Sequence, residues 1–414
     1  MKVKDKKLNL QQNIIYNTVG MTINLACQWL ITVLVVRLSS DFTNSGLLTL
    51  AMSVTNVFYA IASYSLRTYQ VSDVNNKYRD SIYVQVRIVT CAIAFLLCGI
   101  YCAALYQDER FFGIVLYMVF RVIEAFIDIL QGFAQRAMRM DLAGKAMAIR
   151  GIGNVVVFAV VILLTDSFNL AIIGIILVSI LVMFFYDLGY SRYIADLRGK
   201  LDWPVIKKIL IECLPMGVAS ALNTSIISIP RTLLDMVEGK EILGIYGALA
   251  VPTVIVQVAA TYVFNPMLPV YATYYTEKKE KDFFKLFKKT MIAIVVLSIV
   301  ALGAAALLED ILLPILLGEE IVPYIYMFIP MLVCTILNAI VWFQTSILVV
   351  IRDFKSYLWG TVAAVILTIL IGYPFIEKFS MNGVNYTLFV VMMMQIIVFG
   401  IVLCIRFRKN FTEK

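Results

Sequence analysis

The sequence predicts an all-α integral membrane protein of about twelve transmembrane helices in two six-helix lobes, and three observations predict it. Of the 414 residues, 61% are hydrophobic and only 15% are charged, with a mean hydropathy of +0.89. A soluble globular domain is closer to half apolar and a quarter charged, so this composition excludes that class. The other two observations are a series of apolar runs and the distribution of basic residues between them.

The apolar runs give the helices in order. A membrane-spanning helix needs roughly 20 mainly apolar residues. Charge clusters and Pro, Gly and Asn divide the chain into twelve such segments, at residues 13–36, 44–70, 82–106, 111–135, 147–165, 168–189, 209–234, 242–270, 288–308, 322–350, 357–376 and 383–406. The first is too long and too polar for a secretory signal peptide and lacks a cleavage site, so we expect it to be retained.

The basic residues predict the orientation. The loops between segments alternate in charge. The odd-numbered loops are short and mostly acidic, whereas basic residues gather at both termini and in the even-numbered loops: Lys2, Lys4, Lys6, Lys7, Lys77, Arg79, Arg139, Lys145, Arg198, Lys200, Lys278 to Lys289, Arg352, Lys355, Arg406, Arg408 and Lys409. By the positive-inside rule both termini are cytoplasmic. Attraction to anionic lipid explains the net charge of +8, so we expect no nucleic-acid partner.

Residue usage argues against several kinds of chemistry. Histidine is absent, which removes the commonest acid–base group and transition-metal ligand. The seven cysteines lie within or beside apolar runs without CxxC spacing, which favours buried thiols over disulfides or metal sites. We therefore predict no catalytic residues, no metal and no cofactor, and a protein that is not an enzyme.

A linker divides the chain into lobes at residues 1–200 and 201–414. The stretch DLRGKLDWPVIKKILIECLP predicts an amphipathic lead-in, a helical segment that precedes the seventh span, and Asp202 is suited to capping this helix. Gly46 and Gly244 open similar second helices of the two halves, and each helix ends in a Tyr- and charge-rich loop. Two parallel repeats of this kind are the usual frame for alternating access around a midplane site.

The fourth span, FRVIEAFIDILQGFAQR, carries a polar stripe within the membrane. At 100° per residue the stripe falls on one helix face, and it consists of Arg121, Glu124, Asp128, Gln131 and Gln135. Such charges are too costly to face lipid, so they face a helix partner or a wet cavity. Two interpretations stay open: an internal network that locks the lobe, or the wall of an anion-binding cavity.

Other spans contribute polar residues that suit hydrogen bonding between helices or a hydrated wall. On the first span these are Asn13, Asn17, Gly20, Asn24 and Gln28; on the second, Arg67; on the seventh, Ser220, Asn223, Thr224, Ser228 and Arg231; on the eighth, Gln257, Thr261 and Asn265. Arg67 sits close enough to an interface to snorkel, whereas Arg231 has only acidic loops near it and so points to a cavity. Asp187, near the end of the sixth span, is expected to meet Arg192 and cytoplasmic water.

Buried arginines of this kind suit phosphate. A planar guanidinium binds phosphate oxygens bidentately and keeps its charge in a low dielectric. Arginines at several depths without a catalytic constellation favour movement of a phosphorylated amphiphile over its chemical conversion. We predict Arg121, Arg231, Arg67, Asn24, Gln28 and Asn223 as substrate-binding residues, with Glu124 and Asp128 as a charge relay or structural pair.

The sequence also resembles Wzx-type polysaccharide flippases, within the multidrug/oligosaccharidyl-lipid/polysaccharide exporter superfamily. The stretches that carry the resemblance are the Asn-rich first span, GLLTLAMSVTNVFYAIASYSLRTYQVSDV, RVIEAFIDILQGFAQR and SIPRTLLDMVEGKEILGIYGALAVP. The resemblance implies a V-shaped pair of lobes around a cationic cavity in a bacterial cytoplasmic membrane. By position, Arg67, Arg231 and Arg121 correspond to the family's basic cavity residues, although spans nine to twelve hold few charges.

The resemblance also implies a substrate, an undecaprenyl diphosphate-linked oligosaccharide repeat unit carried to the outer leaflet for O-antigen or capsule, with polysaccharide polymerase machinery as a partner. Rocking lobes would reorient the headgroup while the prenyl tail stays in lipid, and Glu124 and Asp128 are candidates for coupling to an ion gradient. The alternatives are a drug or cation exporter of the same superfamily, a polysaccharide polymerase or membrane glycosyltransferase, and a structural scaffold. An exporter of cations calls for unpaired acidic residues, and the enzymes call for a long outer loop.

Overall fold

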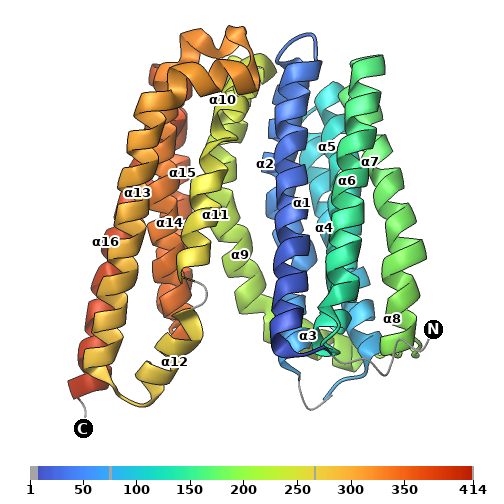
Figure 1. The fold of residues 1–414 in the computed structure, drawn as a ribbon, viewed down its shortest axis with the longest axis vertical. Coiled ribbons are helices and arrows are strands. Elements are labelled where there is room, and N and C mark those ends of the chain that lie inside the picture. The colour runs from blue at the N-terminus through green and yellow to red at the C-terminus, as the bar shows by residue number, and fades with distance from the viewer. Residues whose placement is uncertain (1–7, 74–76, 265–266, 413–414) are drawn as a thin grey trace. The chain divides into compact units, whose positions relative to one another are not determined.

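The computed structural model describes residues 8–73, 77–264 and 267–412, and in these ranges the chain is built of helices joined by short turns (Figure 1). It forms two compact units, Met1–Thr224 and Ser225–Lys414, which divide inside one long helix, α9. The lobe boundary predicted at residue 200 lies just ahead of that helix and stays a prediction.

Unit 1 holds the first eight α-helices and the start of α9. The elements are α1 (Leu10–Leu38), α2 (Thr43–Ser63), α3 (Leu66–Ser72), α4 (Asp80–Leu105), α5 (Glu109–Arg136), α6 (Met140–Thr165), α7 (Phe168–Val182), the π-helix η2 (Met183–Asp187), α8 (Leu188–Ile194) and α9 (Trp203–Glu238). Within the unit α1 packs mainly against α6, whereas α5 packs against α2, α4 and α7. α5 is therefore the central helix of unit 1.

Unit 2 holds the rest of α9 and seven further α-helices. They are α10 (Lys240–Ala250), α11 (Thr253–Phe264), α12 (Leu268–Thr276), α13 (Glu280–Leu317), the 3₁₀-helix η4 (Glu319–Met327), α14 (Phe328–Val350), α15 (Phe354–Phe379) and α16 (Met381–Thr412). α14 is central here, in contact with α11, α13, α15 and α16.

The all-α membrane fold is confirmed, because described helices lie along each of the twelve predicted segments, four of which are divided into two or three helices, and the chain is a multi-pass membrane protein. In the described residues nine helices are long and apolar enough to cross a membrane, or ten if α10 and α11, bent by 46° at their break, form one span. Neither α5 nor α9 is among them. The charges on α5, and the charges and prolines on α9, lower the hydropathy of these long helices.

The ninth span is longer than the sequence predicts. Hydropathy predicts its end at residue 308, with Glu309 and Asp310 in an outer loop. Instead α13 continues to Leu317 through both carboxylates and through Pro314. At 1.5 Å per residue its 38 residues measure about 57 Å, well beyond a bilayer core of roughly 30 Å, so its ends extend past the hydrocarbon.

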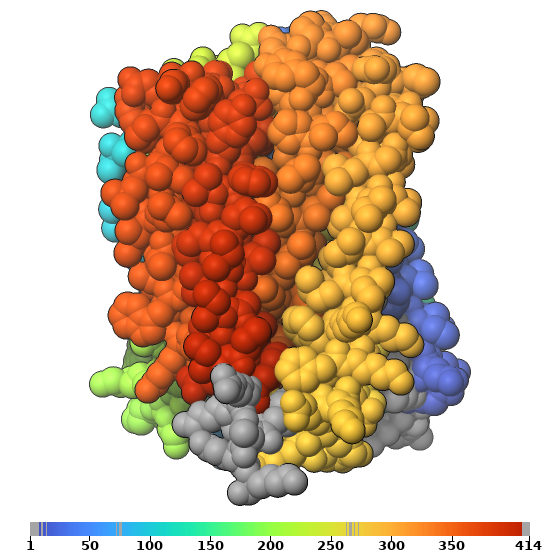
Figure 2. All heavy atoms as spheres, turned by 90° about the vertical axis from the view of Figure 1, so that its left-hand side faces the viewer, coloured from blue at the N-terminus to red at the C-terminus, as the bar shows by residue number. Residues whose placement is uncertain are grey.

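The outer surface of the helices is apolar, as a lipid-facing surface requires. Figure 2 shows the face of unit 2 formed by α13, α15 and α16. Only 6% of the most apolar window of α13 is buried, and Leu307 is 80% exposed. Large apolar side chains this exposed would be an aggregation hazard in water, and in a bilayer they contact acyl chains.

Glycines bring α1 and α6 close together. A Cβ atom placed on Gly20 would lie 2.5 Å from the Cα of Gly144, and one on Gly151 would lie 3.2 Å from the Cα of Asn24. In membranes, where lipid is as apolar as the side chains, such small residues allow the backbone approach that holds helices together. The Asn-rich face of α1 therefore serves packing in part.

Gly20→Leu is expected to lower the thermal unfolding temperature of the detergent-purified protein, because overpacking typically costs about 1–3 kcal/mol. Gly99→Leu on α4 is the matched control, since nothing lies within 4 Å of the Cβ position there. Equal unfolding temperatures for the two variants would show that the close approach of α1 and α6 does not stabilise unit 1.

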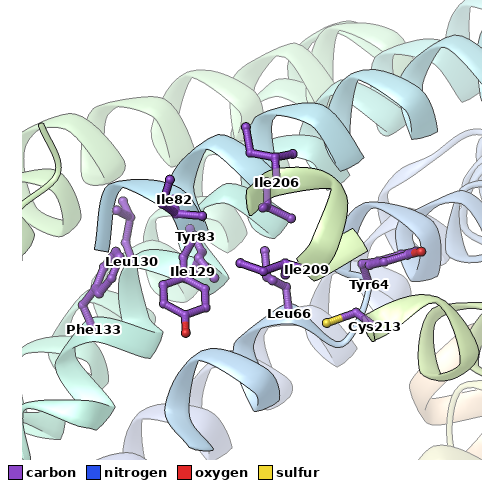
Figure 3. Close-up of a cluster of buried hydrophobic side chains, with 11 residues drawn as sticks. Tyr64, Leu66, Ile82, Tyr83, Ile129, Leu130, Phe133, Ile206, Ile209 and Cys213 are labelled. Carbon is purple, nitrogen blue, oxygen red and sulfur yellow. The ribbon is translucent and has the colours of Figure 1, made fainter. Parts of the chain in front are cut away.

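An apolar cluster fastens the start of α9 to the rest of unit 1 (Figure 3). Ile206 and Ile209 are fully buried against Tyr64, Tyr83 and neighbouring side chains of α3, α4 and α5, whereas the intervening Lys207 and Lys208 are exposed. The predicted amphipathic lead-in is thus confirmed. The carboxylate of Asp202 accepts from the backbone N–H of Val205 at 3.3 Å, as the cap of this helix.

Candidate functional site

A cluster of charged side chains lies in unit 1 where the second span breaks between α2 and α3. Tyr64 and Ser65 have φ angles of 50° and 51°, a left-handed conformation that non-glycine residues rarely adopt. A helix end leaves carbonyl groups without intrahelical donors. Here the carbonyl of Ala62 accepts hydrogen bonds from the guanidinium of Arg87 and, at 2.8 Å, from the hydroxyl of Thr90. The break is therefore satisfied by side chains of α4.

Asp128 of α5 lies between two arginines next to this break. Its Oδ1 is 3.0 Å from Nη1 of Arg67, and its Oδ2 is 3.1 Å from Nη2 of Arg87. Arg67 also donates from Nε and Nη2 to Oε1 of Gln135, at 3.1 and 3.0 Å. Two guanidinium charges against one carboxylate leave this Asp128 triad, defined as Arg67, Arg87 and Asp128, with one net positive charge.

Arg121 forms a separate, balanced group on α5. Its Nη1 is 2.6 Å from Oε2 of Glu124, its Nη2 donates to Oδ1 of Asn56 at 2.9 Å, and its guanidinium lies 3.8 Å from the ring centroid of Tyr59. Glu124 also accepts from the amide of Gln28 on α1 at 3.4 Å. The pair is neutral, and its hydrogen bonds connect α5 to α1 and α2. These contacts therefore favour the interpretation that Arg121 belongs to an internal network that locks the lobe.

The predicted stripe on α5 therefore divides into two groups with different partners. Arg87, which anchors one of them, was missed by the sequence reasoning because it lies near the start of an otherwise apolar span. Its position was nevertheless a usable signal, since a charge within a membrane segment has to find a partner. The partner itself lies on a helix 41 residues further along the chain.

The predicted residues of α1 serve mainly contacts within unit 1. Asn13 is buried and its Oδ1 accepts from the backbone N–H of Met140 at 2.8 Å, which fixes the start of α6. Asn24 is half-buried where α1 approaches Gly151. Gln28 is more exposed and reaches Glu124.

A carboxylate outside the membrane span, Asp73, lies at the end of α3. Asp73 accepts hydrogen bonds from the backbone N–H groups of Lys77 and Tyr78 and from the hydroxyl of Tyr83. Partial burial raises the pKa of Asp73, but these hydrogen bonds outweigh burial and hold the pKa below its ordinary value. The carboxylate thus stays charged at neutral pH and links the end of α3 to Lys77, Tyr78 and Tyr83, and this stabilisation is lost as the pH falls through the lowered pKa.

The prediction that Asp187 meets Arg192 and cytoplasmic water is wrong. The sixth span widens into the π-helix η2 at Met183–Asp187, which changes the face that its last residues present. Asp187 is fully buried, 3.5 Å from Nη1 of Arg150 on α6, and it accepts from the hydroxyl of Tyr190 at 3.0 Å. It belongs to an internal ion pair of unit 1.

Unit 2 holds the predicted cation Arg231, and its surroundings differ from those of the arginines in unit 1. Arg231 is half-buried on α9, about 10 Å from the end of that helix at Glu238. Its guanidinium lies 5.9 Å from the ring centroid of Tyr246, whose hydroxyl donates to Oδ1 of Asn385 at 3.0 Å. Its Nε is buried without a hydrogen-bond partner, and no carboxylate of the described residues pairs with it.

The remaining predicted residues are polar positions on α9 and α11. Asn223 is half-buried on α9, and so is Gln257 on α11. The hydroxyl of Thr261 is bonded to the carbonyl of Val258 at 2.7 Å, one turn back along its own helix. Asn265 lies outside the described residues. Six of the seven cysteines are buried and all are free, whereas Cys404 is exposed on α16.

Comparison with solved structures identifies the fold. Over 97% of this chain and 99% of the other, the structure matches an inward-facing multidrug resistance MATE family transporter of the MOP superfamily, with a TM-score of 0.71 at 13% identity. A eukaryotic MATE transporter, AtDTX14, matches over 97% of this chain and 98% of its own with a TM-score of 0.65 at 14% identity. The chain has the fold of these transporters.

Comparison of sequences adds one distant relative. The capsular polysaccharide biosynthesis protein CapF of Staphylococcus aureus is 24% identical over 311 residues, which are 75% of this chain and 78% of that protein. No protein-family model matches the sequence.

Proposed function

We propose that this protein is a flippase of the Wzx type, which carries undecaprenyl diphosphate-linked oligosaccharide repeat units from the cytoplasmic to the outer leaflet of a bacterial plasma membrane by alternating access. The transporter fold supports movement of a solute, and the name of the capsule biosynthesis relative supports a glycan as its cargo. In this proposal both termini are cytoplasmic, and the glycan is polymerised afterwards by separate machinery.

The observation that carries the proposal is the state of Arg231. Arg231 lies in the predicted seventh span, and a guanidinium within the membrane is costly unless an anion compensates it. The described residues provide Arg231 with an aromatic ring but with no carboxylate. A diphosphate would supply the missing counter-charge, and the planar guanidinium matches two of its oxygens at once.

The carboxylates within the spans of unit 1 favour an anionic cargo over a cationic one. Glu124, Asp128 and Asp187 each have an arginine within salt-bridge distance. A cation exporter calls for acidic side chains that are available to its substrate. The prediction that Glu124 and Asp128 couple transport to an ion gradient stays a prediction.

A binding measurement with the purified full-length protein tests the proposal. We expect undecaprenyl diphosphate in detergent to quench tryptophan fluorescence or to raise the unfolding temperature, and undecaprenol without phosphate to do neither. Phosphatidylglycerol is the second control, because it carries a single phosphodiester charge on an ordinary lipid. Equal binding of phosphatidylglycerol, or stabilisation by a lipophilic cation instead, would contradict the proposal.

A further inference from the structure

We infer that the carboxylate of Asp128 competes with the substrate's diphosphate for Arg67. Asp128 pairs with Arg67 until a phosphate oxygen takes the place of the carboxylate, while Arg87 keeps Asp128 in position throughout the exchange. The inference rests on the proposed function, because it concerns how unit 1 binds and releases a diphosphate headgroup. It assigns different roles to two arginines that share one carboxylate.

Arg67 has the contacts of a residue that can exchange one anionic partner for another. Its side chain is 25% exposed, and it donates twice to Gln135, whose amide oxygen is neutral and whose side chain is exposed. Among the described residues its ionic partner is Asp128, itself 24% exposed. A diphosphate offers more negative charge than this set, so it is the stronger acceptor for the same N–H groups.

Arg87 has the contacts of a fixed residue. Its side chain is fully buried, and its two hydrogen-bonded nitrogens are engaged by the carbonyl of Ala62 and by Asp128. The first of these contacts is one of two hydrogen bonds to the end of α2, the other coming from Thr90, so moving Arg87 would remove one of them and leave a buried charge without its partners. Arg87 therefore remains in place when Arg67 leaves.

The charge count explains why two arginines are needed. With both in place the triad carries one net positive charge; once Arg67 has turned to a substrate, Arg87 and Asp128 remain as a neutral pair. Without Arg87, the departure of Arg67 would strand a lone carboxylate within the membrane, which is strongly unfavourable. Arg87 thus makes the exchange of Arg67 possible.

Competition also gives a transporter a way to release its cargo. A site that binds too tightly traps its ligand, and conduction or transport requires binding weak enough to reverse. Asp128 stays next to Arg67 and reclaims it when the phosphate leaves. It follows that a weaker acceptor at Asp128 should tighten binding of the diphosphate, and that a stronger acceptor for Arg67 should weaken it.

The test measures the dissociation constant of undecaprenyl diphosphate in detergent for variants of the full-length protein. We expect Asp128→Asn to bind about tenfold more tightly, the change that corresponds to one charge-assisted contact. Gln135→Glu, a change at an exposed position, places a second carboxylate on Arg67 and should bind several-fold more weakly. Asp196→Asn is the matched control, since this exposed residue of unit 1 changes net charge equally without touching the triad.

Two double variants separate a competitor from a structural role. The gain of Asp128→Asn should vanish in Asp128→Asn/Arg67→Gln, because the gain acts through Arg67. Arg87→Gln should weaken binding in the wild-type background, where Arg67 is then held more tightly, and should have no effect in the Asp128→Asn background. Thermal unfolding of each variant confirms that a folded protein is being titrated.

Weaker or unchanged binding of undecaprenyl diphosphate by folded Asp128→Asn would refute the claim that Asp128 competes for Arg67. A gain in affinity that persists in Asp128→Asn/Arg67→Gln would refute it as well. Equal weakening by Arg87→Gln in both backgrounds would overturn the positioning role. If Arg87→Gln does not fold, Asp128→Asn and Gln135→Glu still decide the main claim by the signs of their effects. Absence of binding by the wild type would instead refute the proposed function and the inference with it.

Discussion

Arg231→Gln is expected to lose binding of undecaprenyl diphosphate by at least about 30-fold while the protein remains folded. Truncating one partner of a desolvated, hydrogen-bonded charge pair costs about 2–5 kcal/mol, and 1.4 kcal/mol is a factor of ten. The glutamine side chain would keep some length and polarity but would carry no charge and no bidentate fork. Isothermal titration in detergent, with the unfolding temperature recorded in parallel, measures both quantities.

Lys207→Gln is the control for this experiment, because it removes a positive charge from an exposed position of the same helix. Removing Arg231 removes a half-buried cation that no carboxylate of the described residues pairs with, so its variant should be at least as stable as the wild type. Equal affinity for Arg231→Gln and Lys207→Gln would show that Arg231 does not bind the headgroup.

Arg121→Met is expected to lower the stability of the protein, whereas Arg231→Gln is expected to lower its affinity for the substrate. The change leaves Glu124 within the membrane without its arginine and removes the contacts to Asn56 and Tyr59. Breaking a buried ion pair from one side costs about 3–5 kcal/mol, so we expect a large fall in unfolding temperature and in the yield of folded protein. Gln28 alone, at 3.4 Å from Glu124, does not replace the lost charge.

The paired variant Arg121→Met/Glu124→Leu decides between a lock and a binding group. If the pair only locks unit 1, replacing both charges restores most of the stability together with substrate binding, as apolar replacements of buried pairs do elsewhere. A double variant that is stable but has lost affinity for undecaprenyl diphosphate would assign Arg121 to the headgroup site instead.

The helices could be predicted from the sequence because hydropathy and the length of a bilayer leave few alternatives. Breaks and extensions were harder to predict. The break at Tyr64 and Ser65 contains no glycine or proline from which it could be predicted. It is stabilised by hydrogen bonds from Arg87 and Thr90 of another helix. The extension of α13 through Glu309 and Asp310 likewise contradicts the usual interpretation of charges as loop residues.

The candidate site could be predicted only as a set of residue types. Periodicity placed Arg121, Glu124 and Asp128 on one face of α5, and the structure retains that face. Their partners depend on which helices pack together, which one sequence does not specify. For this reason the pairing of Asp128 with Arg67 and Arg87 could not be predicted, and Asp187, which was expected to meet Arg192 and water, is paired with Arg150.

The most direct test of the proposed flippase is leaflet exchange in proteoliposomes. The purified protein is reconstituted with an undecaprenyl diphosphate-linked oligosaccharide, and the glycan exposed on the outside is followed with a lectin or a glycosidase. We expect exchange that depends on the wild-type protein, proceeds with Lys207→Gln and is lost with Arg231→Gln. A wild-type protein that moves no glycan lipid but exports a lipophilic cation would contradict the account.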